Sequence, residues 1–281
     1  MSDSLVGFSM HPRWVYNGTP VDFLEPLRAA GLGALEYELD ANGPDWSHFI
    51  PSMENCQQLG FTLCFHAPYK TPYTIAGFAG QEQASIEAAY APMLDVAARF
   101  GPATVVVHGA HSATRSYEEL CADTVAFLRW ALARYPSLTF ALENLYPDPA
   151  RIKTGVTRAG LLRIVEEIDD PRLGICWDMG HDVLAGHYDL PDGAWLQHVC
   201  HVHVHDIDSQ GVDHYPFMYE RVPYQTWLPA LAKTGFAAIV TLEIKSEHLI
   251  PLGMAQIMEM LVNSISEIRR LLTPSNSVAS S

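Results

Sequence analysis

Short apolar runs alternate along the chain with longer segments in which apolar residues recur at helical spacing. Runs such as TVVVHG and AIVTLEI are apolar almost throughout, which is typical of strands in a parallel sheet with both faces buried. The runs predict eight β-strands, at Leu5–Met10, Ala34–Leu39, Thr62–Ala67, Thr104–Gly109, Leu138–Asn144, Leu173–Asp178, Val199–Asp206 and Ala238–Ile244.

Helical patterns fill the segments between these strands. Ser116 and Glu119 have the spacing of a capping box and predict a helix start, and Pro92 is expected to kink the helix that contains it. The clearest helical segments are 21–31, 83–101, 117–135 and about 251–272.

The alternation of strand and helix selects the fold class. Eight such units in one chain of this length are typical of a closed (β/α)8 barrel, which needs about 250 residues. No G-x-G-x-x-G follows the first strand, so the fingerprint of a dinucleotide-binding sheet is missing. We therefore expect an α/β protein with a single domain, a TIM barrel over 1–272, and a disordered polar tail at 273–281.

Composition and charge exclude some classes of binding partner. The chain has 17 basic and 32 acidic residues, a net charge of −15, and so offers no basic stripe for nucleic acid. No segment approaches the ~20 apolar residues of a membrane span, and no signal peptide is evident. The five cysteines have no C-x-x-C spacing, which argues against a disulfide framework. We expect a cytoplasmic protein that acts on a small molecule, without a membrane or nucleic-acid partner.

Ionisable side chains end six consecutive strands, the third to the eighth. In a barrel these ends converge on one mouth, where the active sites of this fold lie. Carboxylates and imidazoles gathered in a low-dielectric mouth are costly without a cation, so the pattern predicts a divalent metal site. The six residues are His66, His108, Glu143, Asp178, His203 and Glu243.

Further residues are candidates for the same mouth. His181 follows Asp178 by three residues, and His214 lies in the loop after the seventh strand, so both can add ligands. His11 and Glu36, near the ends of the first two strands, could contact substrate.

The seventh strand carries three histidines on one face. His201 and His205 share the face of His203, but only one level should meet the metal, and His201 is expected to lie deeper. Asp206 could orient a neighbouring imidazole.

These residues give the chain a resemblance to a known family. In order and spacing, HAPY, VVVHG, LEN, WDMGH, H-x-x-D and LEI resemble the xylose isomerase-like (β/α) barrel superfamily. This superfamily includes ketose 3-epimerases, inosose dehydratases and isomerases, and endonuclease IV. The similarity spans the third to the eighth strand.

The epimerase-like branch implies one metal held by Glu143, Asp178, His203 and Glu243. It also implies that the two glutamates are catalytic: one takes a proton from the carbon next to a carbonyl, and the other returns it through an enediolate. His181 would then touch a substrate hydroxyl, and His66 and His108 would bind substrate. A single metal of this kind would be Mn, Mg, Co or Fe.

The endonuclease IV-like branch implies two or three zinc ions and phosphodiester cleavage. His66 and His108 match its first site, shared with Glu143, and His181 and His214 match two ligands of its third. The pattern Asp-x-His is broken, because Val212 stands two residues before His214, with Asp213 adjacent.

The sequence does not decide between the isomerase or epimerase activity and the phosphodiesterase activity. A metal-stabilised binding protein without turnover is a third alternative. The Glu143 and Glu243 pair and the acidic surface favour a sugar or sugar-phosphate isomerase or epimerase. The additional histidines favour the zinc-dependent phosphodiesterase. Arg221 and Lys245 are the candidates for a phosphate contact, and a homo-oligomer is possible because outer helices of such barrels often pair.

Overall fold

The computed structural model describes residues 4–10, 21–39, 49–69 and 73–273. His11 and the expected disordered tail, apart from Thr273, lie outside these ranges.

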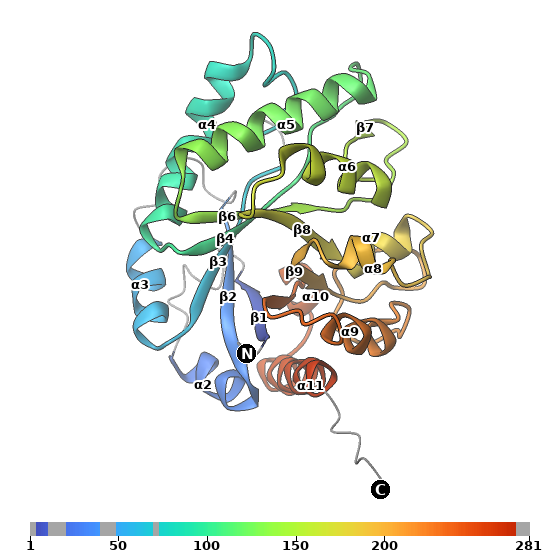
Figure 1. The fold of residues 1–281 in the computed structure, drawn as a ribbon. Coiled ribbons are helices and arrows are strands. Elements are labelled where there is room, and N and C mark those ends of the chain that lie inside the picture. The colour runs from blue at the N-terminus through green and yellow to red at the C-terminus, as the bar shows by residue number, and fades with distance from the viewer. Residues whose placement is uncertain (1–3, 11–20, 40–48, 70–72, 274–281) are drawn as a thin grey trace, which may run out of the picture.

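Eight parallel strands close into one barrel, which confirms the predicted fold and the single domain. Around the barrel the strands follow the order β1-β10-β9-β8-β6-β4-β3-β2 (Figure 1). Their bounds are β1 Leu5–Met10, β2 Leu32–Glu38, β3 Thr62–His66, β4 Ala103–Val107, β6 Leu138–Glu143, β8 Leu173–Asp178, β9 Val199–Val204 and β10 Ile239–Leu242.

Helices surround the barrel and cover the outward faces of its strands (Figure 1). The capping box predicted at Ser116 and Glu119 is present at the start of α5. The helices are α2 Val21–Ala30, α3 Ile50–Gln58, α4 Gln83–Arg99, α5 Tyr117–Arg134, α6 Arg158–Ile168, α7 Met179–Leu184, α8 Gly193–Leu196, α9 Tyr224–Ala232, α10 Ser246–Leu249 and α11 Met254–Leu272.

Alternate residues of each strand point into the barrel or out toward the helices. The outward residues, such as Val202 and Val204, join the main hydrophobic core. The inward residues deep in the barrel are small, for example Ala141 and Cys176. Toward the carboxyl ends of the strands they become polar, so the barrel interior ends in ionisable side chains at its mouth.

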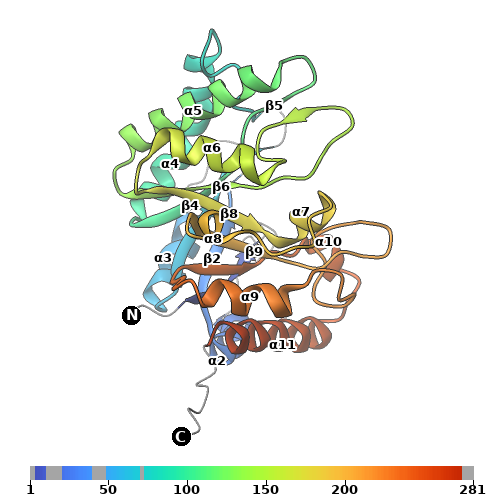
Figure 2. The same ribbon diagram turned by 45° about the vertical axis from the view of Figure 1, so that its right-hand side comes forward.

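A two-stranded antiparallel sheet stands at this mouth. β5 (His111–Ser112) follows β4, and β7 (Ile152–Lys153) follows β6. Thr154 N–H donates to the Ala110 carbonyl at 3.0 Å, and the hydroxyls of Thr124 and Thr154 lie 3.1 Å apart in the core. A Cβ on Gly109 would collide with the Thr154 hydroxyl, so glycine permits this close approach. Figure 2 shows β5 on the side of the barrel where α7 and α10 also lie.

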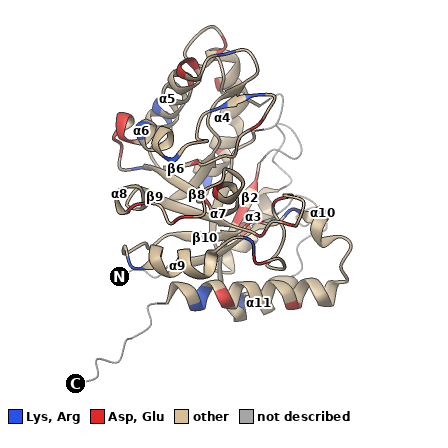
Figure 3. Cartoon of the chain, turned by 90° about the vertical axis from the view of Figure 1, so that its right-hand side faces the viewer, with Lys and Arg blue, Asp and Glu red and all other residues tan. Residues whose placement is uncertain are grey.

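Charged residues of both signs are interspersed on the outer helices, α5 and α11 among them (Figure 3). Among the helices that the structure describes, none is both long enough and apolar enough to cross a membrane.

Candidate active site

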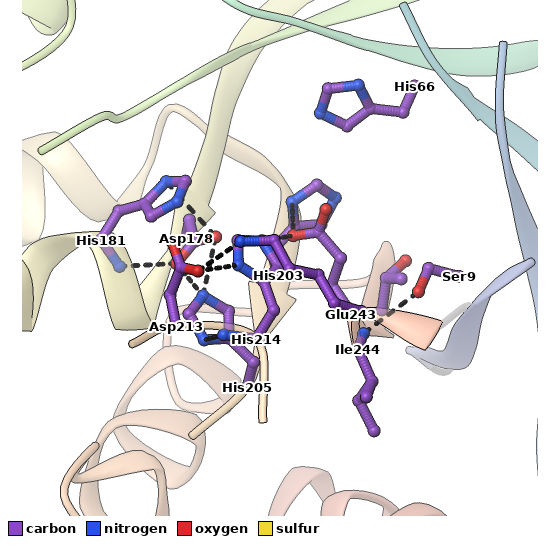
Figure 4. Close-up of polar contacts among 12 residues, drawn as sticks. Ser9, His66, Asp178, His181, His203, His205, Asp213, His214, Glu243 and Ile244 are labelled. Atoms are coloured by element: carbon purple, nitrogen blue, oxygen red, sulfur yellow. Dashed lines mark hydrogen bonds and ion pairs between the residues drawn. The ribbon is translucent and has the colours of Figure 1, made fainter. Parts of the chain in front are cut away.

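The predicted strand-end residues lie together in the barrel mouth. The parallel register places Asp178 beside His203, and Glu143 one strand further round. Figure 4 shows His203 in the middle of the group, with Asp178 and His181 on one side and Glu243 on the other. Glu143, Asp178 and His203 are each at most 1% exposed, so their interactions take place away from bulk water.

The Glu143 carboxylate faces two groups of imidazoles with its two oxygens. Oε2 lies 3.1 Å from His66 Nε2 and 2.8 Å from His108 Nε2. Oε1 lies 3.2 Å from His181 Nδ1 and 3.6 Å from His203 Nδ1. A carboxylate with this placement can bridge two cation sites.

Glu243 approaches the same group from another side of the barrel. It follows β10, three strands round the barrel from β6. Its Oε2 lies 3.0 Å from His203 Nδ1 and 3.1 Å from His214 Nε2. The Ile244 N–H donates to the Ser9 hydroxyl at 3.2 Å (Figure 4), which ties this segment to β1.

The His203 ring has a fixed orientation because Glu36 lies beneath it. Glu36 is 1% exposed, and its Oε1 lies 3.0 Å from His203 Nε2. Since a carboxylate can only accept, Nε2 carries a proton, so Nδ1 is the nitrogen that can give a lone pair to a cation held with the Glu143 and Glu243 oxygens. That buried Nδ1 has no hydrogen-bond partner. Burial alone would lower the pKa of His203, but nearby negative groups, Glu243 and Glu36 among them, raise it well above its usual range.

Glu36 also contacts the deeper histidine. His201 Nε2 lies 2.8 Å from Glu36 Oε2 and 3.1 Å from the Thr241 hydroxyl. Burial alone would raise the pKa of Glu36, but the charge of His203 and hydrogen bonds from both imidazoles lower it below its usual range. His201 therefore lies one level below His203, as expected, and both Glu36 oxygens face imidazoles.

His66 directs its Nε2 toward the Glu143 carboxylate. Its Nδ1 donates to the Ala67 carbonyl at 2.8 Å, so in the neutral ring Nε2 is an acceptor facing Glu143. Burial alone would lower the pKa of His66, but the hydrogen bond and charge of Glu143 raise it to about 9. Burial lowers the pKa of His108, on the same Glu143 oxygen, to about 4. The metal-free site therefore holds a proton on His66, at a position that a cation can take.

The segment after β8 fixes Asp178 and His181. Asp178 caps α7 by accepting the His181 N–H at 2.7 Å. The Asn144 side chain makes two hydrogen bonds to the Asp178 backbone: its Oδ1 accepts from the Asp178 N–H at 2.6 Å, and its Nδ2 donates to the Asp178 carbonyl at 2.9 Å. His181 Nδ1 donates to the Asn144 carbonyl at 3.0 Å, which leaves Nε2 as the free acceptor.

His205 lies against Asp178. The His214 backbone N–H, which can only donate, contacts His205 Nδ1 at 3.0 Å. Nε2 of His205 therefore carries the proton and donates to Asp178 Oδ1 at 3.0 Å. In this tautomer His205 orients Asp178 and has no lone pair left for a metal. A Cβ on Gly180 would collide with the His205 ring, so glycine is needed here.

The break in the Asp-x-His pattern has a structural counterpart. Val212 is 41% exposed. The Asp213 carboxylate instead lies 3.0 Å from His214 Nδ1, accepts a hydrogen bond from the Tyr146 hydroxyl at 3.1 Å and pairs with Lys245. In the Asp-x-His pattern the aspartate at position 212 would bind metal together with His214. Here position 212 is a valine, and the carboxylate of Asp213 contacts the His214 ring instead.

The donor set fits a divalent cation. Among the described residues, candidate ligand atoms within 4.8 Å of one another form four groups in the mouth: Glu143, Asp178, His203 and Glu243; His66, His203 and Glu243; His66, His108 and Glu143; and Asp178, His181, His205 and His214. In the last group His205 orients Asp178, which leaves the other three as ligands. A cation can replace the proton between His66 Nε2 and Glu143, and it can take the lone pair of the His203 Nδ1, which has no hydrogen-bond partner. The donors are oxygen and imidazole nitrogen, which suit Mn²⁺, Fe²⁺, Co²⁺ or Zn²⁺.

A cavity of about 320 Å³ opens above these groups. This volume is at the lower end for small-molecule sites, which suits a single small substrate. Its wall includes Lys245, whereas Arg221 is exposed and does not line it. A second hollow of about 230 Å³, lined by Ser9, Glu36 and Glu38, shares His66, Tyr69, His214, Glu243 and Lys245 with the first.

One expected contact differs in the structure. The Asp206 side chain does not face an imidazole; it accepts hydrogen bonds from backbone amides of its own loop at 2.5–3.1 Å. The roles of Asn144 and His205, and the contact of Asp213 with His214, were not predicted from the sequence. Each depends on which imidazole nitrogen faces which oxygen, and the strand pattern carries no signal for that.

Comparison with known proteins places the chain. A family model described as the xylose isomerase-like TIM barrel matches residues 24–264, which include every residue of the cluster. The chain belongs to this family. An uncharacterized protein of Methanocaldococcus jannaschii, MJ1311, is 30% identical over 96 residues, a match that spans 33% of this chain and 32% of that protein.

Solved structures share the family fold over nearly the whole chain. A D-tagatose 3-epimerase-like protein is 20% identical with a TM-score of 0.65, covering 94% of this chain and 98% of that one. The D-allulose 3-epimerase of Methylomonas sp. in complex with D-allulose is 14% identical with a TM-score of 0.66, covering 97% of each chain. The D-psicose 3-epimerase of Clostridium cellulolyticum H10 with D-tagatose is 13% identical with a TM-score of 0.69, covering 97% and 99%.

Proposed function

We propose that this family member is a divalent-metal-dependent sugar isomerase or epimerase that works by proton transfer between glutamates. The observation that carries the proposal is the pair Glu143 and Glu243, which meet at the buried, unpartnered His203 Nδ1 from different sides of the barrel. Fold similarity to proteins named as 3-epimerases of tagatose, allulose and psicose supports the same class.

In this proposal Glu143, Asp178, His203 and Glu243 hold the metal. When bound, the metal supplies a Lewis acid that polarises a carbonyl and stabilises the negative charge of an enediolate. His203 contributes Nδ1 because Glu36 keeps the proton on Nε2. Asp178 is oriented by His205 and by the backbone of α7.

The two glutamates carry the proton. Glu243 is 18% exposed at its side chain and faces the cavity, whereas Glu143 is 1% exposed and lies at its floor. One carboxylate removes the proton from the carbon next to the carbonyl, and the other delivers a proton to the opposite face of the same carbon. His181, which also lines the cavity, hydrogen-bonds a substrate hydroxyl through Nε2, and His66 and His108 line the same wall.

The test is turnover of ketoses, including D-allulose and D-tagatose, in heavy water. We expect Glu243→Gln to lose both epimerisation and solvent deuterium incorporation by at least about 10²-fold, the usual contribution of a general acid or base. Glu259→Gln, an exposed change on α11, is the matched control and should retain full activity. Full activity in Glu243→Gln would exclude the proposed role.

A zinc-dependent phosphodiesterase is the second candidate. It is favoured by the two-sided Glu143 carboxylate, which could join a metal at His66 and His108 to a metal at His203. Metal content separates the candidates. About one Mn, Mg, Co or Fe ion per chain supports the isomerase, and two or three zinc ions with hydrolysis of bis(p-nitrophenyl) phosphate support the phosphodiesterase.

A further inference from the structure

The small sheet at the barrel mouth carries basic side chains to the rim of the cavity. His111 on β5 is directly opposite Lys153 on β7, so their side chains lie on the same face of the sheet. Arg151 stands two residues before Lys153, which places it on that face as well. All three line the cavity above the metal-ligand cluster.

The same cavity is lined by four carboxylates: Glu143 and Glu243 belong to the metal-ligand cluster, and Asp148 and Asp213 lie beside Lys153 and Lys245. The chain has a net charge of −15, yet Arg151, Lys153 and Lys245 all line one cavity of about 320 Å³. Charge inside a narrow cleft acts on a ligand more strongly than scattered surface charge, because the low-dielectric walls focus the field.

The carboxylates at the rim do not pair equally with the three basic side chains. Lys245 is paired directly with Asp213. Lys153 Nζ is 3.8 Å from Asp148, which is beyond hydrogen-bond distance. Within the described ranges Arg151 makes no ion pair. Among the described residues Arg151 therefore carries the unpaired positive charge of the rim, and Lys153, whose ion pair with Asp148 is long, is less neutralised than Lys245.

Lys153 is held in place rather than swinging freely in solvent. Its side chain is 17% exposed, its ammonium donates to the Tyr146 carbonyl at 3.3 Å, and it lies 4.8 Å from the centre of the Tyr146 ring. A lysine anchored in this way loses less conformational freedom when it binds a ligand.

We propose that Arg151 and Lys153, with His111 beside them, bind an anionic group of the substrate. A substrate then spans the cavity, with its carbonyl end at the metal-ligand cluster and its oxyanion at the rim. This inference rests on the proposed sugar isomerase or epimerase function and names its substrate class: a sugar carrying a phosphate, or alternatively a carboxylate, at the end remote from the reacting carbon.

The first experiment compares substrates on the metal-loaded full chain. We expect a higher kcat/KM for ketose phosphates, such as D-fructose 6-phosphate, than for the unphosphorylated ketoses. The double variant Arg151→Gln/Lys153→Gln should lower kcat/KM for the phosphates on the order of 10–100-fold, the range for losing charge-assisted hydrogen bonds. Its kcat/KM for neutral ketoses should stay within about twofold, since neither side chain contacts the cluster. Arg163→Gln is the control, because Arg163 lies on the exposed face of α6, where it pairs with Glu118 of α5.

The second experiment needs no turnover. Inorganic phosphate is titrated calorimetrically into the metal-loaded protein and into the same variants. Weaker phosphate binding in Arg151→Gln/Lys153→Gln, but not in Arg163→Gln, supports the anion site even if no sugar is epimerised, in which case only the proposed function fails. Unchanged phosphate affinity together with equal turnover of neutral and phosphorylated ketoses overturns the anion site and leaves the proposed function standing. Preference for a ketose uronate over the phosphate assigns the anion to a carboxylate.

Discussion

The site depends on which nitrogen of each imidazole carries its proton. Glu36 fixes this for His203, and the Ala67 carbonyl fixes it for His66, so the nitrogens left to bind a cation are Nδ1 of His203 and Nε2 of His66, and both face Glu143. Partners of this kind orient metal-ligating histidines in many proteins, and losing them typically weakens metal binding 10–100-fold. Glu36 was expected to contact substrate, but its buried carboxylate faces His201 and His203, which favours an orienting role.

This role can be tested by changing Glu36 to glutamine. Glu36→Gln can turn an N–H toward His203 Nε2, which then accepts and places its own proton on Nδ1, the nitrogen that faces the cluster. We expect the dissociation constant of the metal to rise by roughly 10–100-fold, measured by competition with a chromophoric chelator. His201→Gln is the matched variant, because His201 contacts the same carboxylate one level deeper and should leave metal affinity nearly unchanged. A loss in His201→Gln as large as in His203→Gln would contradict this layering.

At the scale of an element, Asp206 organises the loop between β9 and α9. Its fully buried carboxylate accepts hydrogen bonds from the amides of Ile207, Met218, Tyr219, Glu220 and Arg221. This loop carries Asp213 and His214 to the mouth, so Asp206 supports the site through the backbone rather than through an imidazole.

Asp206→Ala should therefore destabilise the fold strongly, although Asp206 is not one of the candidate metal ligands. Leaving several buried amides without an acceptor should cost about 3 kcal/mol or more in the free energy of unfolding, measured with urea. Asp208→Ala removes acceptors for two amides, but at an exposed part of the same loop, and should cost less than about 1 kcal/mol. Equal costs for the two variants would rule out the special role of Asp206.

The sequence predicted the strands well, and for a physical reason. Strands buried on both faces must be apolar along their length, so each leaves a visible run; β9, for example, was predicted over Val199–Asp206 and spans Val199–Val204. The small sheet of β5 and β7 was missed because two residues per strand are too few for any periodicity.

Only the candidate metal ligands at the strand ends could be predicted from the sequence, and not the residues that orient them. Residues at the ends of parallel strands must share one mouth, which brings Glu143, Asp178 and His203 together from the pattern alone. The contact of Glu36 with His203 joins residues 167 positions apart on strands that are not neighbours, so it follows from closure of the barrel. The basic side chains at the rim could not be predicted either, because Arg151 and Lys153 stand in a connection without a recognisable motif.

At the scale of the whole molecule, the proposed metal should stabilise the fold. A ligand that binds the folded chain at 100 times its dissociation constant adds about 2.7 kcal/mol to the free energy of unfolding. We expect chelation to lower Tm by roughly 5 °C, and restored metal to return it. Glu143→Gln/Glu243→Gln should lose this dependence on metal, which calorimetric scans with and without chelator would reveal. A metal-dependent Tm in the double variant would place the bound ion elsewhere.

The pairing of β5 with β7 also restricts how this barrel can diverge. The two connections that carry the rim, one from β4 and one from β6, are joined by an antiparallel register in which His111 faces Lys153. Inserting a single residue into either connection shifts that register by one and turns one partner's side chain to the opposite face. A lineage that changes substrate through this part of the rim must therefore alter both connections together, or give up the pairing before either can drift.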